Sequence, residues 1–186
     1  MIIAVVGSGG KTTLVKKLAQ QYREEGKTVL VTTSTHMFIE EDTLLTDDAA
    51  TIIRALKENG YAMAGIPEGI KIKTLSDHTF EEVSGCTDVV LVEADGSKHM
   101  PLKYPNAIEP VIPAHTDKII VVWGPHGLGR PLREVCHRPQ LAAGCLNVSE
   151  DTVMTREHVR ILLQCGYLSP LHRRFPSAEI TVYPPL

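Results

Sequence analysis

Apolar residues occur in continuous runs of strand length at several places along this chain of 186 residues. Such runs, with no polar position inside them, are typical of strands that are buried on both faces of a parallel sheet. We therefore predict strands over residues 1–6, 28–33, 88–93 and 118–123. Further, short strands are predicted over 61–65, 70–75 and 180–183.

Between these runs, apolar residues recur at helical spacing. In a helix predicted over residues 13–25, one face collects Leu14, Val15, Leu18, Ala19 and Tyr22. Further helices are predicted over 47–59 and 139–146, over a short segment that Ser76 or Asp77 caps, and over a segment that Thr155 caps and Gly166 ends. The first strand, helix and strand fit one βαβ unit, which requires parallel pairing and a right-handed crossover.

Composition limits the classes of function. Hydrophobic residues make up 43% and charged residues 22% of the chain, as in ordinary globular domains. The formal net charge of −3 provides no broad basic surface, so we expect no nucleic-acid partner. No apolar stretch approaches the ~20 residues that span a bilayer, and no secretory signal opens the chain. We expect no membrane partner and a cytoplasmic location.

The first strand leads directly into a glycine-rich turn at the head of the first helix. The turn comprises Gly7, Ser8, Gly9, Gly10, Lys11, Thr12 and Thr13. Glycines let the backbone wrap around an anion, and the helix N-terminus adds its positive end. We predict that all seven residues bind a nucleoside triphosphate, ATP or GTP, with Lys11 at the outer phosphates and the Thr12 hydroxyl on Mg²⁺.

The turn departs from the commonest phosphate-binding pattern, which has a glycine five residues before Gly10, where this chain has Val5. The shorter form also occurs in amide-forming ligases that phosphorylate a carboxylate. An ordinary flexible turn is the alternative interpretation, and the position directly after an N-terminal strand argues against it.

Acidic residues end the central strand over 88–93, where Glu93 and Asp95 stand two positions apart. Ligands of open α/β sheets bind at the carboxyl ends of the strands, and a carboxylate there can hold Mg²⁺ or orient a nucleophile. We predict Lys11, Glu93 and Asp95 as catalytic residues, and Thr12, Glu93 and Asp95 as metal ligands. The pattern does not say which carboxylate holds the metal, and a solvated turn is the alternative.

Other polar residues near this edge are weaker candidates. The hydroxyls of residues 32–35 are expected at the same sheet edge, where they could order Mg²⁺-bound water, and His36 beside them could contact substrate or phosphate. The alternative is a polar strand end that satisfies its own turn. Charge stabilisation is a further option for the basic residues Lys98, Lys103, Arg130 and Arg133, and contact with a partner or substrate is an option for His137 and Arg138. Each of these residues alone is better explained as a solvated surface charge.

The four cysteines, Cys86, Cys136, Cys145 and Cys165, are widely spaced and form no C-x-x-C pair. We expect reduced, mostly buried thiols, and neither a zinc site nor a disulfide framework. The eight histidines show no spacing typical of metal ligands, which argues against a zinc enzyme.

The segments VVGSGGKTT, VLVTTSTHM, VLVEADGSKHMPLKYP, EPVIP and CHRP, in this order, resemble the selenium-dependent molybdenum hydroxylase accessory proteins, also described as selenium cofactor biosynthesis proteins. The resemblance extends to about residue 140. It implies a phosphate-loop nucleotide-binding fold and a role in maturing selenium-dependent molybdenum hydroxylases, with such an enzyme or a pathway protein as a partner.

Together these features predict an α/β, three-layer P-loop NTPase-like fold with a mostly parallel sheet flanked by helices, in a single domain over residues 1–186. Members of the resembled family usually continue into a strand ending in an N-K-x-D-like segment. We therefore expect this chain to lack its C-terminal part.

Three functions remain open at this stage. The first is a Mg²⁺-dependent nucleoside triphosphatase or phosphoryl-transfer enzyme that serves selenium or molybdenum cofactor maturation. The second is an ATP-dependent ligase that forms an acyl phosphate, which the short loop suggests. The third is a non-catalytic, nucleotide-gated chaperone that delivers a cofactor.

Overall fold

The computed structural model describes residues 1–186, and its contacts divide the chain into two compact units. The first unit contains residues 1–4, 12–94 and 112–117. The second contains residues 5–11, 95–111 and 118–186. The fold is α/β, with mostly parallel strands flanked by helices, as predicted.

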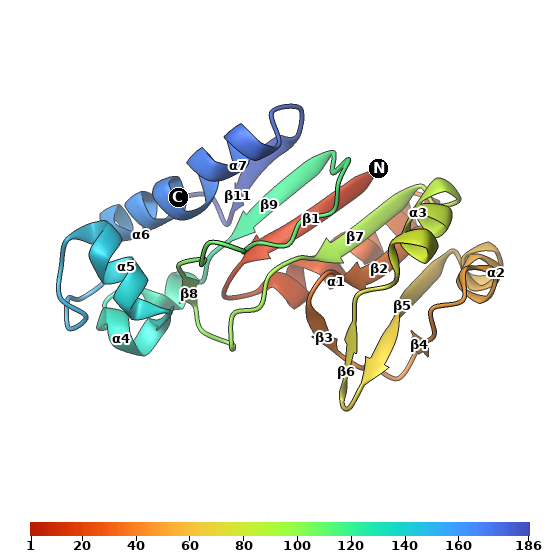
Figure 1. Ribbon diagram of the computed structural model, residues 1–186, viewed down its shortest axis with the longest axis horizontal. Coiled ribbons are helices and arrows are strands. Elements are labelled where there is room, and N and C mark those ends of the chain that lie inside the picture. The colour runs from red at the N-terminus through yellow and green to blue at the C-terminus, as the bar shows by residue number, and fades with distance from the viewer. The chain divides into compact units, whose positions relative to one another are not determined.

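The strands that lie wholly in the first unit are β2 (Val29–Thr33), β3 (His36–Phe38), β4 (Thr43–Leu45), β5 (Tyr61–Glu68), β6 (Lys71–Lys73) and β7 (Val89–Glu93). Strand β2 pairs in parallel with β5 and β7, and β4 pairs in parallel with β5 (Figure 1). Strand β6 is antiparallel to both β5 and β3. Every residue of β2 and β7 is buried, which confirms the prediction from their apolar runs.

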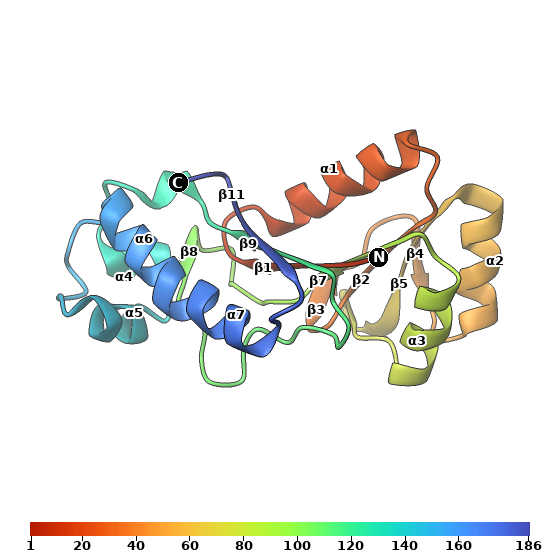
Figure 2. The same cartoon turned by 90° about the horizontal axis from the view of Figure 1, so that it is seen from above.

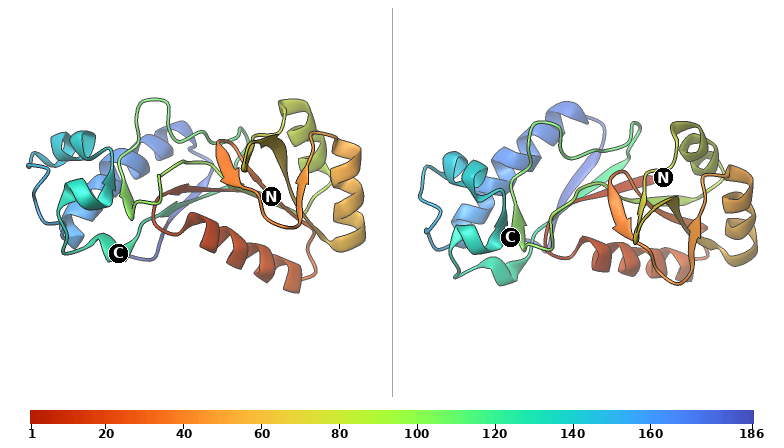
Figure 3. Two further views of the ribbon diagram at one scale, coloured as in Figure 1. Left: turned by 90° about the horizontal axis from the view of Figure 1, so that it is seen from below. Right: turned by 60° about the horizontal axis from the view of Figure 1, so that its bottom comes forward.

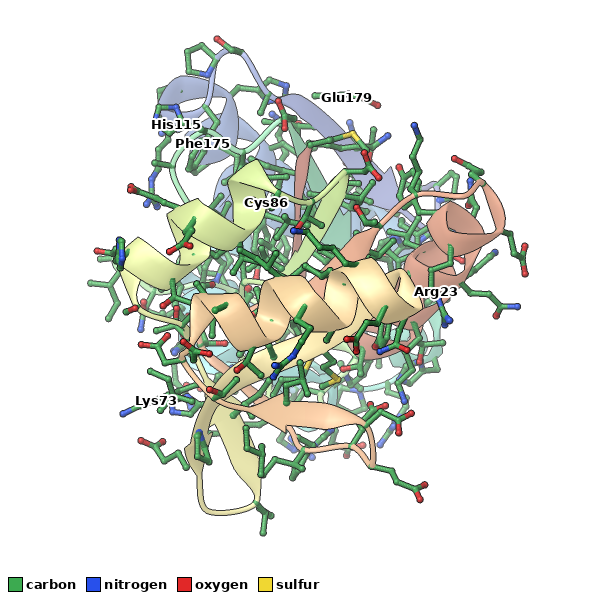
Figure 4. All side chains as sticks on the ribbon, turned by 90° about the vertical axis from the view of Figure 1, so that its right-hand side faces the viewer. Arg23, Lys73, Cys86, His115, Phe175 and Glu179 are labelled. Atoms are coloured by element: carbon green, nitrogen blue, oxygen red, sulfur yellow. The ribbon has the colours of Figure 1, made fainter.

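The helices of the first unit are α1 (Lys11–Glu24, of which Lys11 belongs to the second unit), α2 (Ala49–Asn59) and α3 (Asp77–Gly85). Figure 2 shows α1 on one side of β2 and β7 and α3 on the other. Ser76 caps α3 through its hydroxyl, and Gly60 ends α2 at a φ of 66°. At the far end of α1, the Arg23 guanidinium lies 5.0 Å from the centre of the Tyr61 ring (Arg23 is labelled in Figure 4).

Strand β1 (Ile2–Gly7) contributes to both units, because its first residues belong to one and its last to the other. At its start, the Met1 carbonyl accepts a hydrogen bond from Val90 N of β7. Directly after its end, Ser8 N donates to the Val122 carbonyl over 2.9 Å. Figure 3 shows the turn that joins β1 to α1.

The strands and helices of the second unit are β8 (Leu102–Lys103), β9 (Lys118–Val122), the 3₁₀ turn η1 (Pro125–Gly127), α4 (Leu132–Val135), β10 (Cys136–His137), α5 (Pro139–Leu146), α6 (Arg156–Leu163), the π-helical turn η2 (Gln164–Leu168), α7 (Ser169–Arg174) and β11 (Glu179–Tyr183). Strands β9 and β11 are parallel, and so are β8 and β10. Among all helices of the chain, none combines the length and apolarity that crossing a bilayer requires.

One predicted helix end is wrong. Thr155 caps α6 as expected, but the helix does not stop at Gly166. It passes through the π-helical turn η2 and continues as α7 to Arg174 (Figure 1). A Cβ atom at Gly166 would lie 3.0 Å from Pro105 Cδ and 3.2 Å from Tyr104 Cε2, so this glycine permits close packing inside a helix and does not end one.

Candidate functional site

The glycine-rich turn has a backbone that only glycine adopts easily. The φ angles of Gly7, Gly9 and Gly10 are 90°, 77° and 135°. A Cβ atom on Gly7 would lie 2.1 Å from the Val122 carbonyl oxygen, and one on Gly9 would lie 2.6 Å from Gly124 Cα. Two of these glycines are therefore required both by their φ angle and by close contact with neighbouring backbone.

The first two residues of the turn are held by other parts of the second unit. Gly7 N donates to Asp95 Oδ2 over 3.1 Å. Ser8 is 1% exposed, and its hydroxyl donates to the Met100 carbonyl. Together with the hydrogen bond from Ser8 N to the Val122 carbonyl, these contacts fix the position of the first residues of the turn. Gly10, further along the turn, is exposed to solvent.

Lys11 directs its ammonium group back to the start of the same turn. Its Nζ atom donates to the Gly7 carbonyl over 3.0 Å and to Ser97 Oγ over 3.1 Å. The residue is only 4% exposed. A cation is thus held beside the turn by the loop that follows β7.

In the first unit, Thr12 and Glu93 form a second pair. The Thr12 hydroxyl donates to Glu93 Oε2 over 2.8 Å, and Thr33 Oγ1 donates to the Glu93 carbonyl over 2.8 Å. A hydroxyl and a carboxylate are hard oxygen donors of the kind that Mg²⁺ prefers. No group of three or more His, Cys, Asp or Glu side chains that suits a metal ion is present. The donor set fits an ion that takes its other ligands from phosphate and water.

Asp95 has a different environment from Glu93. Its side chain has no exposed surface, and it accepts hydrogen bonds from Gly7 N, from Tyr167 OH over 2.8 Å and from the Lys103 ammonium. Burial, followed by the charge of Asp95, raises the pKa of Tyr167 well above its ordinary value, so this phenol stays protonated and donates. The Asp95 carboxylate is occupied in holding the turn.

Charged residues continue this buried network. Lys103 Nζ lies 2.9 Å from Glu109 Oε2, and Arg138 binds both oxygens of Glu109, at 2.5 and 2.9 Å. Burial alone would raise the pKa of Glu109, but the bonds from Arg138 and Lys103 outweigh it and lower the pKa to about 2. Burial, and next the charges of Arg138 and Lys103, lower the pKa of His137.

The weaker candidate residues from the sequence differ in their exposure to solvent. The expectation of a solvated Lys103 is wrong, because its side chain has no exposed surface. Arg130 and Arg133 are exposed and pair with Glu134 and Asp151, as expected of surface charges. Lys98 and Thr13 are exposed as well.

The expectation that the cysteines are mostly buried is wrong. Cys136 is buried and Cys145 is partly buried, whereas Cys86 and Cys165 are exposed.

The threonine hydroxyls at the end of β2 and directly after it form hydrogen bonds within the protein. Thr32 Oγ1 donates to the Ala64 carbonyl, and Thr35 N donates to Thr33 Oγ1, which satisfies the local turn. His36 belongs to β3, and its Nε2 atom lies 2.7 Å from Glu68 Oε2.

Three residues in these contacts were not singled out from sequence. Ser97 lies two positions after Asp95, so the sequence could have indicated it as a site residue. Glu109 appeared only as part of the EPVIP segment, with no role assigned, and Tyr167 was not mentioned. Their partners Lys103 and Asp95 lie 6 and 72 positions away, and no sequence pattern relates them.

Comparison with known proteins places the chain in a family. A family model described as YqeC protein matches residues 3–140. The chain belongs to the YqeC family. The uncharacterized protein YqeC of Escherichia coli (strain K12) is 34% identical to it over 170 residues, which cover 82% of this chain and 63% of that relative. This YqeC chain therefore spans less than two thirds of the length of that relative.

A more distant similarity links this YqeC chain to the cyanophycin synthetase of Synechocystis. The two are 28% identical over 145 residues, which cover 63% of this chain and 16% of the synthetase. No solved structure matches the chain.

Proposed function

We propose that this YqeC protein binds a Mg²⁺-nucleoside triphosphate at its glycine-rich turn and hydrolyses it or transfers its terminal phosphoryl group. The return of the Lys11 ammonium to the Gly7 carbonyl is the observation that carries the proposal. This hydrogen bond keeps a cation beside a turn that leads into a 14-residue helix, where backbone N–H groups and the helix dipole favour an anion.

The contacts support a division of labour within the predicted site. Because Gly7 N and Ser8 N donate to protein oxygens, we assign the phosphate contacts to the backbone from Gly9 to Thr13. Lys11 would neutralise the outer phosphates. P-loop enzymes supply the same combination of backbone and lysine.

Thr12 and Glu93 are the proposed metal ligands. Their 2.8 Å contact brings a hydroxyl and a carboxylate together, and Thr12 is the chain neighbour of Lys11. Bound there, Mg²⁺ would draw charge from the phosphoryl oxygens. Asp95 is assigned a positioning role, because its carboxylate bonds to Gly7 N and Lys103. We therefore propose Glu93, and not Asp95, as the metal-binding carboxylate.

The biological role follows from family membership and from the resemblance found in the sequence. YqeC membership supports an accessory protein, and we propose maturation of selenium-dependent molybdenum hydroxylases as its pathway. A hydroxylase or another protein of that pathway is the proposed partner.

Phosphate release from Mg-ATP and Mg-GTP tests the chemical step. We expect release by the wild type and loss of at least about tenfold in Lys11→Ala, with little change in the exposed-site control Lys17→Ala. Equal release by wild type and Lys11→Ala would contradict the proposal.

A ligase is the second candidate, and the similarity to cyanophycin synthetase favours it specifically. A ligase of this kind would release phosphate only when a carboxylate and an amine are both present. Adding a mixture of amino acids and short peptides to the same assay therefore separates the two activities. Binding without release under every condition would favour the nucleotide-gated chaperone.

A further inference from the structure

The loop that follows β7 contacts the glycine-rich turn at two points, and both contacts lie within the second unit. At the first, Ser97 Oγ accepts a hydrogen bond from Lys11 Nζ over 3.1 Å. At the second, the Met100 carbonyl accepts a hydrogen bond from the Ser8 hydroxyl. Only two residues separate Ser97 from Met100, so the segment between the contacts is short and is fixed at both ends against the glycine-rich turn.

These two residues, Lys98 and His99, form the centre of a tight turn. Met100 N donates to the Ser97 carbonyl over 3.0 Å, which closes the turn across them. Their φ angles are 48° and 60°. Positive φ at both central positions is the pattern of a type I′ turn, in which Asn and Gly are the favoured residues. Lysine and histidine adopt this left-handed backbone only at a cost in free energy.

The choice of lysine at this position needs a reason other than local structure. Residues in disfavoured backbone conformations persist where the surrounding structure holds them, and they cluster at functional sites. Lys98 is exposed, so its ammonium group can reach a dissolved ligand. A solvated surface charge would explain the exposure of Lys98, but not a lysine at a position that asparagine fills at lower cost.

We propose that Lys98 binds the terminal phosphate of the bound nucleoside triphosphate and makes the site prefer a triphosphate to a diphosphate. This inference rests on the proposed nucleotide site. Ser97 connects the tight turn to Lys11, the residue assigned to the outer phosphates, so the Lys98 backbone lies beside the same end of the nucleotide. A second ammonium group at that end forms a charge-assisted hydrogen bond that a diphosphate cannot accept.

Calorimetric titrations of the full chain test the proposal with Mg-ADP and with the Mg²⁺ complex of the non-hydrolysable β,γ-imido analogue of ATP, and with the corresponding guanosine pair. The wild type should bind a triphosphate analogue more tightly than the diphosphate of the same base. Lys98→Asn removes the ammonium group and suits the left-handed backbone, so its thermal unfolding midpoint should not fall. It should weaken triphosphate binding by about tenfold and change diphosphate binding by less than about twofold.

Two further variants serve as controls. Lys98→Arg keeps the positive charge and should retain a preference for the triphosphate. Lys17→Ala removes an exposed lysine of α1 and should change neither affinity.

The outcomes separate this inference from the proposed function. If the wild type binds the triphosphate analogue and Lys98→Asn binds it equally well, the role of Lys98 is overturned and the nucleotide site stands. Equal weakening of triphosphate and diphosphate binding in Lys98→Asn also overturns that role, because the turn then acts only through structure. A wild type that binds neither nucleotide overturns the proposed function together with this inference.

Discussion

The Lys103 ammonium contacts the Asp95 carboxylate, and neither side chain has any exposed surface. Through Gly7 N, the same carboxylate holds the entry to the glycine-rich turn. A buried ion pair is costly to break from one side, because the remaining charge is left without a partner. The geometry of the turn therefore depends on Lys103, which is distant in sequence from the glycine-rich turn.

We predict that Lys103→Met lowers the free energy of unfolding by about 3–5 kcal/mol. Neutralising the partner should recover part of this loss, so the double variant Lys103→Met/Asp95→Asn should be more stable than the sum of the single effects implies. Urea unfolding of the four proteins measures the coupling. Strictly additive single effects would show that the pair contributes no specific interaction.

The glycine requirement of the turn can be separated into two causes. Gly9 and Gly26 have nearly equal φ angles of 77° and 76°, but a Cβ atom meets backbone 2.6 Å away only at Gly9, and at Gly26 it meets nothing within 4 Å. Gly26→Ala should cost about 1–2 kcal/mol from the φ angle alone. Gly9→Ala should cost clearly more in thermal or urea unfolding. Equal losses would mean that the contacts of Gly9 are easily relieved.

Acid should weaken the second unit through Glu109. Its pKa is lowered from 4.5 to about 2 in the folded protein, so the unfolded chain takes up the proton first as pH falls. The stabilisation from Glu109 is present above pH 4.5 and is lost progressively as pH falls toward 2. Glu109→Gln should therefore unfold with a weaker pH dependence across this interval. An identical slope in urea midpoints for both proteins would contradict this assignment.

Much of the local structure is readable from sequence because it depends on neighbours in the chain. Strands β2 and β7 and the Thr155 cap were predicted and are present, and Ser76 is the cap at the helix where Ser76 or Asp77 was predicted. Each depends on a few consecutive residues and on the period of a strand or helix.

The buried network could not be predicted in this way. Lysine is almost always exposed, so Lys103 gave no sign that it would be buried. Its burial depends on Asp95 and Glu109, and Tyr167 reaches the same carboxylate from 72 positions away. Gly166 was assigned as a helix end, because sequence does not distinguish that use of glycine from close packing against Tyr104.

Glu93 should control the metal dependence of nucleotide binding. Its Oε2 atom accepts the Thr12 hydroxyl, whereas Asp95 is held by Lys103 and Tyr167. We predict that Glu93→Gln reduces affinity for ATP by about tenfold in Mg²⁺ and by much less in EDTA, since only the metal-bound form uses this carboxylate. Equal losses in both buffers would argue for a structural role only.

The most direct measurement is a calorimetric titration of the wild type, Lys11→Ala and the control Lys17→Ala with Mg-ATP and Mg-GTP. Our account predicts that the wild type binds at least one of the two, that Lys11→Ala weakens this binding by about a hundredfold or more, and that Lys17→Ala leaves it unchanged. Absence of binding to both nucleotides, or equal affinity of wild type and Lys11→Ala, would contradict the assignment of the turn as a phosphate-binding site.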